Sequence, residues 1–215
     1  MQIYVFPMYL VFEGIDGAGK TSITRSLAEK LSKKNTTAIC LGEPTFGKYG
    51  IKARSLIESD KKTNQCELLN LFTQDRREHV ANKINPAIDF ISKRTNFCIL
   101  QDRGFLSAAA YHAETNQNIW KILAEQRMLS PIPTYFIYID IPADIALRRI
   151  KTRNSSRSVF DNISELSKIR SRYQKIAEQS DLPIWTLDGT LPILENVQTI
   201  IEHVILSNES RKNRN

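Results

Sequence analysis

Cysteine is scarce in this chain of 215 residues, with only Cys40, Cys66 and Cys98, which lie far apart. Two of them sit in apolar runs, where a reduced thiol behaves as a small hydrophobic side chain. Neither a disulfide framework nor a cysteine-based metal site is indicated. Long apolar runs are missing too, and the start, MQIYVFPM, lacks the basic residues and apolar length of a signal peptide. We therefore expect a cytoplasmic protein without a membrane partner.

The chain also lacks internal repeats, low-complexity tracts and linkers that would divide it. We expect one domain over residues 1–206 and a disordered basic tail at 207–215. The formal charge of +7 suits a polyanionic ligand, although the tail contributes part of it. Aromatic residues do not interleave with the charges of the tail, so a nucleic-acid partner is not indicated.

What the chain does contain is a series of short β-branched or aromatic runs with helical patterns between them. The runs lie at residues 9–12, 37–41, 97–100, 135–139 and 184–187. Helices are expected after the first run, over residues 66–79 and over residues 164–177. Strands separated by helices predict a parallel sheet. The expected fold is therefore α/β in three layers, a five-stranded parallel sheet with helices on both faces.

A phosphate-binding loop follows the first predicted strand. Residues 14–21 read GIDGAGKT and match the pattern G-x-x-x-x-G-K-[ST] between a strand and an amphipathic helix. Glycines let the backbone wrap around phosphate oxygens, and the helix N-terminus adds unpaired N–H groups. Lys20 would bridge the β- and γ-phosphates of ATP, and the Thr21 hydroxyl would bind Mg²⁺. The predicted ATP-binding residues are Gly14, Ile15, Asp16, Gly17, Ala18, Gly19, Lys20, Thr21 and Ser22.

From Phe12 onward, the sequence FEGIDGAGKTS resembles the N-terminal segment of thymidylate kinases. Further matches follow in the same order as in that family. Glu43-Pro44 resembles its Arg-Glu-Pro, LLNLFTQDRREHV its LLFAADRAQH helix, and LQDRGFLSAAAYH its Asp-Arg-Tyr segment. RRIKTRNSSRSVFD, followed by RSRYQKIA, resembles its arginine-bearing lid and the helix behind it. The resemblance implies a P-loop kinase that uses Mg²⁺ and ATP to phosphorylate dTMP, a small-molecule nucleotide, and that forms a homodimer through sheet-covering helices.

The resemblance also implies a role for each matching residue of the acceptor side. Phe72 would stack on the thymine ring, and Arg76, one helical turn later, would reach the base carbonyl or the acceptor phosphate. Asp102 would hold the magnesium through water, and Arg103 would grip the acceptor phosphate with both arms of its guanidinium. These last two residues close a predicted strand at the edge where parallel sheets bind their ligands.

The sugar and the transferring phosphoryl group would have their own partners. Asp16 would accept a hydrogen bond from the 3′-hydroxyl, and Tyr111 would lie under the sugar and disfavour a 2′-hydroxyl. Glu43 and Ser107 complete the expected acceptor site. In a lid at about residues 150–162, two arginines would supply positive charge to phosphoryl transfer, since the loop carries no arginine of its own. The residues expected to act in catalysis are Lys20, Arg103, Arg153 and Arg157.

Three departures from the family pattern concern the acceptor. Gly42 replaces the arginine of Arg-Glu-Pro, Gly104 the tyrosine of Asp-Arg-Tyr, and Ala108 stands where many members carry Asn or Thr. One alternative is therefore a kinase for another deoxynucleotide or for a deoxynucleoside, whose free hydroxyl would use Glu43 as a base. A second alternative is a nucleotide-binding regulator that has lost turnover.

Overall fold

Five strands form the centre of the protein, whose computed structural model describes residues 8–59, 64–152 and 162–206. Each strand lies where its run of β-branched and aromatic residues predicts it. Their bounds are β1 (Met8–Glu13), β2 (Thr37–Gly42), β3 (Phe97–Asp102), β4 (Tyr135–Asp140) and β5 (Ile184–Asp188). The predicted five-stranded sheet is confirmed.

The strands pair in the order β2-β3-β1-β4-β5, and every pair is parallel. All six residues of the central strand, β1, are buried, whereas the edge strands β2 and β5 are half-exposed. This is the burial expected of a parallel sheet covered on both faces. Because the chain goes to β3 on one side of β1 and to β4 on the other, a crevice forms at the carboxyl end of β1, where such sheets bind ligands.

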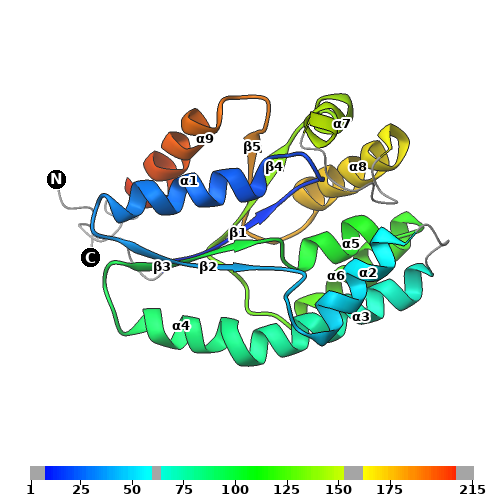
Figure 1. The fold of residues 1–215 in the computed structure, drawn as a ribbon, viewed down its shortest axis with the longest axis horizontal. Coiled ribbons are helices and arrows are strands. Elements are labelled where there is room, and N and C mark those ends of the chain that lie inside the picture. The colour runs from blue at the N-terminus through cyan, green and yellow to red at the C-terminus, as the bar shows by residue number, and fades with distance from the viewer. Residues whose placement is uncertain (1–7, 60–63, 153–161, 207–215) are drawn as a thin grey trace.

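Helices cover both faces of the sheet, as expected (Figure 1). On one face, α1 packs on β1, β2 and β3 and against α9; on the other, α4 contacts β3 and α8 contacts β4 and β5. The α-helices are α1 (Lys20–Ser32), α2 (Lys48–Glu58), α3 (Gln65–His79), α4 (Asn85–Ser92), α5 (Phe105–His112), α6 (Asn116–Arg127), α7 (Ala143–Thr152), α8 (Ile163–Gln179) and α9 (Ile193–Ile200). None of the helices in the described ranges combines the length with the apolar character that a bilayer crossing requires.

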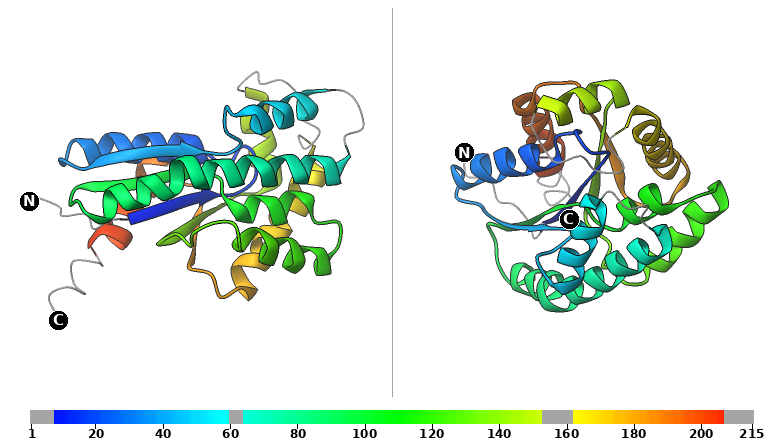
Figure 2. Two further views of the ribbon diagram at one scale, coloured as in Figure 1. Left: turned by 90° about the horizontal axis from the view of Figure 1, so that it is seen from below. Right: turned by 45° about the vertical axis from the view of Figure 1, so that its right-hand side comes forward.

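The helix predicted over residues 66–79 is confirmed as α3, but the chain stays helical well beyond it. A π-helical turn, η1 (Val80–Ile84), joins α3 to α4, and the left view of Figure 2 shows the three as one rod. A similar turn, η2 (Ile201–Leu206), follows α9. Pro86 lies in the first turn of α4 and has no N–H to donate back along the helix. A wider turn just before a proline accommodates that lost hydrogen bond.

Leu27 on α1 provides a test of this packing. Its side chain is 0% exposed, so Leu27→Ala leaves a cavity between helix and sheet and should lower the free energy of unfolding by about 2–5 kcal/mol. Urea denaturation followed by circular dichroism measures the change. Leu194→Ala is the matched control, because Leu194 is 64% exposed and the same truncation there should change stability by about 0.5 kcal/mol or less. Equal losses at the two positions would contradict the packing of α1.

Candidate active site

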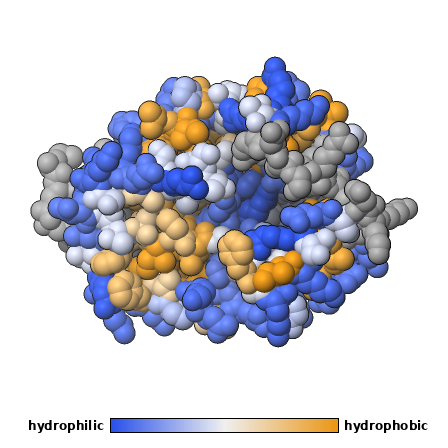
Figure 3. Space-filling view, in the orientation of Figure 1, coloured by the Kyte–Doolittle hydropathy of each residue, from blue (hydrophilic) through white to orange (hydrophobic). Residues whose placement is uncertain are grey.

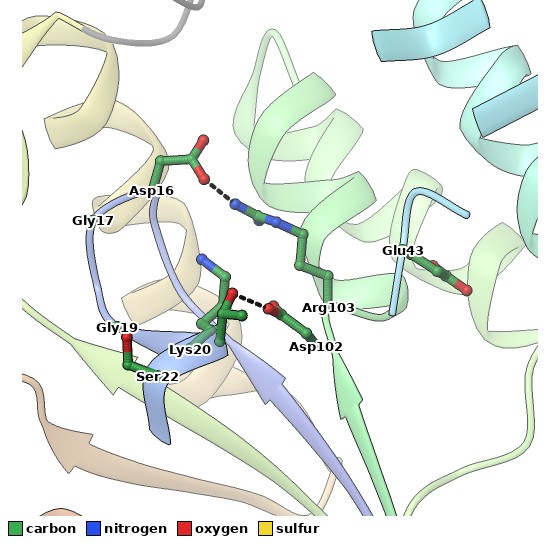
Figure 4. Close-up of a pocket in the computed structure, with 9 residues that line it drawn as sticks. Asp16, Gly17, Gly19, Lys20, Ser22, Glu43, Asp102 and Arg103 are labelled. Carbon is green, nitrogen blue, oxygen red and sulfur yellow. Dashed lines mark hydrogen bonds and ion pairs between the residues drawn. The ribbon is translucent and has the colours of Figure 1, made fainter. Parts of the chain in front are cut away.

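A pocket of about 120 Å³ opens at the carboxyl ends of the central strands. In Figure 3, hydrophilic residues gather in a hollow near the centre of the visible face. The loop after β1, the start of α1, the end of β2 and the end of β3 contribute its walls (Figure 4). All nine lining residues belong to the predicted site: Asp16, Gly17, Gly19, Lys20, Thr21, Ser22, Glu43, Asp102 and Arg103.

The glycine loop has the conformation that its sequence predicts. Gly14, Gly17 and Gly19 have φ values of 142°, 83° and 98°, which side chains on an L-residue rarely allow. A Cβ on Gly17 would collide with the backbone carbonyl of Ala146 on α7, whereas one on Gly19 would meet nothing within 4 Å. The loop is therefore held closely at Gly17 and is open toward the pocket at Gly19, where a phosphate group can approach the backbone.

Lys20 is turned onto the loop that precedes it. Its Nζ donates to the carbonyl oxygens of Gly14 at 2.9 Å and Ile15 at 2.8 Å. Burial, followed by the nearby Arg103 guanidinium, lowers the pKa of Lys20 to about 8. The amine is thus a buried donor with incomplete charge compensation, a state that favours an anionic ligand.

Thr21 and Asp102 meet as the predicted metal site requires. Thr21 Oγ1 donates to Asp102 Oδ2 at 2.5 Å (Figure 4). The other carboxylate oxygen, Asp102 Oδ1, is buried without a hydrogen-bond partner among the described residues. A buried carboxylate oxygen without a partner is costly, and hard cations prefer hydroxyl and carboxylate oxygens. These two residues therefore fit a magnesium ion.

Arg103 follows β3 in the left-handed backbone region, with φ of 66°. Residues other than glycine that adopt this conformation are uncommon and cluster at functional sites. The guanidinium pairs with the Asp16 carboxylate and donates to Ser107 Oγ at 3.2 Å and to the Tyr111 hydroxyl at 3.1 Å. Burial disfavours the charge, but Asp16 outweighs it and raises the pKa of Arg103 well above its ordinary value. The Arg103 guanidinium is thus a permanent cation whose orientation is set by these hydrogen bonds.

Asp16 and Tyr111 lie together with Arg103, as the predicted sugar site requires. The Tyr111 hydroxyl donates to Asp16 Oδ2 at 3.2 Å. Burial opposes ionisation of Asp16, but Arg103 and Lys20 outweigh it and lower the pKa of the carboxyl. Asp16 is consequently an ionised acceptor at neutral pH.

Glu43 and Arg76, both predicted to contact the acceptor, form a buried ion pair with each other. Arg76 donates to Glu43 Oε2 from Nε at 3.0 Å and from Nη2 at 2.5 Å, and His79 Nδ1 lies 3.1 Å from Oε1. Burial disfavours the ionised carboxyl, but Arg76 and His79 outweigh it and lower the pKa of Glu43. Figure 4 shows Glu43 across the pocket from Lys20, with its carboxylate directed away. This carboxylate is held by its own partners and is a poor candidate for a base.

Two further predictions concern Phe72 and the lid. Phe72 is half-buried, and its ring centroid lies 5.3 Å from that of His112. Burial lowers the pKa of His112 to about 4, so this ring is neutral at neutral pH. Of the predicted lid, residues 150–152 end α7 and Asn162 caps α8. Arg153 and Arg157 lie outside the described residues.

Sequence reasoning missed Glu13, the last residue of β1. Its buried carboxylate accepts hydrogen bonds from Gly104 N at 2.9 Å, Ser107 N at 3.3 Å, Ser107 Oγ at 2.6 Å and the Tyr173 hydroxyl at 2.9 Å. An acidic residue ending an otherwise apolar strand, directly before the glycine loop, was the available signal.

Two buried glutamines were also missed. Gln101 accepts from the Tyr9 hydroxyl at 2.7 Å and donates to the carbonyl oxygen of Arg103 at 2.8 Å. Gln126 accepts from Arg76 Nη1 at 2.6 Å. Nothing in the local sequence identifies either one, because their partners come from other elements.

The three departures from the family pattern have different surroundings. A Cβ on Gly42 would make only ordinary contacts, so a side chain is tolerated there. A Cβ on Gly104 would come within 2.8 Å of Val11 Cγ1, so a side chain there requires a shift of the Val11 side chain or of the Gly104 backbone. Ala108 is buried on α5. In the turn that follows Gly42, the carbonyl oxygen of Thr45 accepts a hydrogen bond from Arg54 at 2.5 Å, which supports the turn after β2.

Comparison with known proteins places this geometry in context. The sequence model of the family described as thymidylate kinase matches residues 12–201. A thymidylate kinase of Leptospira borgpetersenii is 30% identical over 96% of this chain and 97% of its own length. That of Desulfotalea psychrophila is 35% identical over 78% and 81%. A probable thymidylate kinase of Thermococcus onnurineus is 32% identical over 93% and 99%.

The lowered pKa of Lys20 predicts that ATP binding takes up protons. At pH 8 the amine of the free protein is about half protonated, and bound phosphates should complete its protonation. We expect an uptake of about half a proton per site at pH 8, falling toward zero at pH 6.5, where Lys20 is already charged. Calorimetric titration in buffers of different ionisation enthalpy measures it. If Lys20→Met retains the uptake, another group is responsible.

Proposed function

The chain belongs to the thymidylate kinase family, and we propose that it transfers the γ-phosphoryl group of ATP to dTMP, giving ADP and dTDP. One observation carries this proposal: the phosphate loop and the fixed cation of Arg103 line the same pocket. The loop suits the phosphates of a nucleotide donor, and the cation beyond it suits the phosphate of an acceptor. Such a kinase serves nucleotide biosynthesis.

The chemistry of the acceptor explains why no base is needed. A nucleotide phosphate with a second pKa of about 6 is largely dianionic at neutral pH and is already a nucleophile. The protein's task is to hold the two phosphates in line and to stabilise charge. A nucleoside hydroxyl would instead benefit from a free carboxylate. The engagement of Glu43 by Arg76 and His79 therefore favours a nucleotide acceptor.

The placement of individual residues supports a role for each of them. Lys20 would leave the loop carbonyls and bind the β- and γ-phosphates, and Arg103 would turn part of its hydrogen bonding to the acceptor phosphate. Asp16 would receive the 3′-hydroxyl, with Tyr111 beside the sugar. Phe72 would stack on the base. Among the described residues, Arg76 bonds to Glu43, Gln126 and the Gly104 carbonyl, and these bonds leave one N–H of Nη1 for the base.

Thr21 and Asp102 would hold the magnesium ion that accompanies ATP. Bound there, the ion would neutralise charge on the β- and γ-phosphate oxygens. The 2.5 Å contact between Thr21 and Asp102 supports this assignment, as does the Asp102 oxygen that has no hydrogen-bond partner within the described ranges.

Two parts of the proposal rest on the family resemblance. The lid arginines Arg153 and Arg157 would add positive charge beside the transferring group, as the family's lid does. A homodimer would form through helices that cover the sheet. A cytoplasmic location agrees with the use of ATP and small nucleotides.

A panel of acceptors with purified protein and ATP tests the function. We expect dTMP to give the highest kcat/KM, ahead of its ribose counterpart, other deoxynucleotides and thymidine. Lys20→Ala should lower turnover about a hundredfold or more while the circular dichroism spectrum stays unchanged. Faster use of thymidine would indicate a nucleoside kinase instead. ATP binding without acceptor-dependent ADP release would indicate a regulator.

Replacing Asp102 tests the metal site. Asp102→Asn keeps the shape but removes the charge, so the free Mg²⁺ concentration for half-maximal rate should rise about tenfold or more. Initial rates measured against free Mg²⁺ at constant ATP give this value. Asp144→Asn is the control, because Asp144 is exposed on α7 and pairs with Arg148. A midpoint equal to that of the unmodified protein would remove Asp102 from the metal site.

A further inference from the structure

We propose that Glu13 is a positioning residue for acceptor phosphorylation, which it supports by holding the start of α5 and, through Ser107, the guanidinium of Arg103. This inference rests on the proposed function and adds to it a residue that contacts neither nucleotide. The observation behind it is one buried carboxylate on β1 that receives four hydrogen bonds, three of them from the segment that follows Arg103.

The contacts form a short path from Glu13 to Arg103. Ser107 Oγ lies 2.6 Å from Glu13 Oε2 and accepts from Arg103 Nη1 at 3.2 Å. A hydroxyl has one proton, so when Ser107 donates it to Glu13, its lone pairs are turned toward Arg103. The charge of Glu13 therefore determines which way the Ser107 hydroxyl points and whether it can receive the guanidinium.

Glu13 also influences Arg103 through hydrogen bonds to the backbone that follows this arginine. Glu13 accepts the N–H groups of Gly104 and Ser107, at the first turn of α5. Arg103 immediately precedes this turn in its left-handed conformation. Such a conformation persists only where neighbouring contacts hold it. Because the turn is tied to β1, the direction in which the Arg103 side chain leaves the backbone is tied to β1 as well.

The surroundings of Glu13 are arranged for an ionised carboxylate. Burial raises the pKa of Glu13, yet the amide groups and the two hydroxyls that reach it can all act as donors. A protonated carboxyl would need to give its own proton to an acceptor and would break one of these bonds. A glutamine would do the same through its NH₂ group, which makes Glu13→Gln a change of hydrogen-bonding direction at nearly constant shape.

Tyr173 supplies a milder and independent perturbation. Its hydroxyl, on α8, donates to Glu13 Oε2 at 2.9 Å and lies 2.8 Å from Ser107 Oγ. Tyr138 is the matched control, since its ring stacks on Tyr173 at 5.3 Å, but its hydroxyl donates to Asp140. Both residues are buried, one on β4 and one on α8, so Tyr173→Phe and Tyr138→Phe delete the same atom from two stacked rings and differ in whether Glu13 loses a partner.

Calorimetric binding of dTMP and of ATP tests the proposal, together with steady-state rates. We expect Glu13→Gln to raise the Kd for dTMP about tenfold and to lower kcat, and Tyr173→Phe to raise that Kd about threefold or more. The Kd for ATP should stay within about twofold in both variants, as should every parameter of Tyr138→Phe. A structural role alone would weaken ATP and dTMP binding together, and that outcome would overturn the proposal.

A double-mutant cycle shows whether Glu13 acts through Arg103. In an Arg103→Ala background, Glu13→Gln should add little further loss of dTMP affinity, because the group that it positions is gone. Additive losses would overturn the proposal. If Glu13→Gln does not fold, as judged by circular dichroism, the same cycle with Tyr173→Phe gives the answer. The acceptor used is the one that the unmodified protein phosphorylates best, so a different preferred acceptor would contradict the proposed function and leave this comparison intact.

Discussion

The register of the parallel strands determines where every part of the site lies. Phe12 of β1 and Gly42 of β2 both pair with Asp102 of β3, so the three strands end at the same level. The glycine loop, the Glu43 turn and the Arg103 turn then begin side by side, although they are far apart in the chain. A slip by one residue in a buried parallel sheet would reverse the facing of a whole strand, which makes this alignment robust. Phosphoryl transfer, which depends on placing two phosphates in line, is supported by hydrogen bonds of the sheet itself.

Two buried arginines around the pocket are each paired with a carboxylate. Arg76 is paired with Glu43, and Arg103 with Asp16. Removing one member of such a pair leaves a charge without compensation, which costs more than the pair contributed. Lys20 differs from them, because its hydrogen-bond partners among the described residues are backbone carbonyls. Of these three buried cations, the one that is hydrogen-bonded to no carboxylate is therefore the one assigned to the transferred phosphates.

The sequence predicts the strands and helices well, but it predicts less well which side chains contact one another. The strands and α3 follow from local patterns, and the glycine loop follows from a pattern with a physical meaning. The ion pair of Arg76 with Glu43 could not be predicted. The spacing of four places Phe72 and Arg76 on one helix face, but it does not indicate which residues pack against that face. The same holds for Glu13, whose partner on α8 is 160 positions away. Long-range hydrogen bonds of this kind depend on the packed structure and leave no periodic trace in the chain.

The close contact between Gly17 and α7 has an evolutionary consequence. Any side chain at this position would collide with the Ala146 backbone, so selection by single substitutions cannot bring a charged residue into this point of the loop. An arginine at this position would require a shift of α7. Positive charge on the donor side must therefore come from other positions of the loop or from segments that this contact leaves unconstrained.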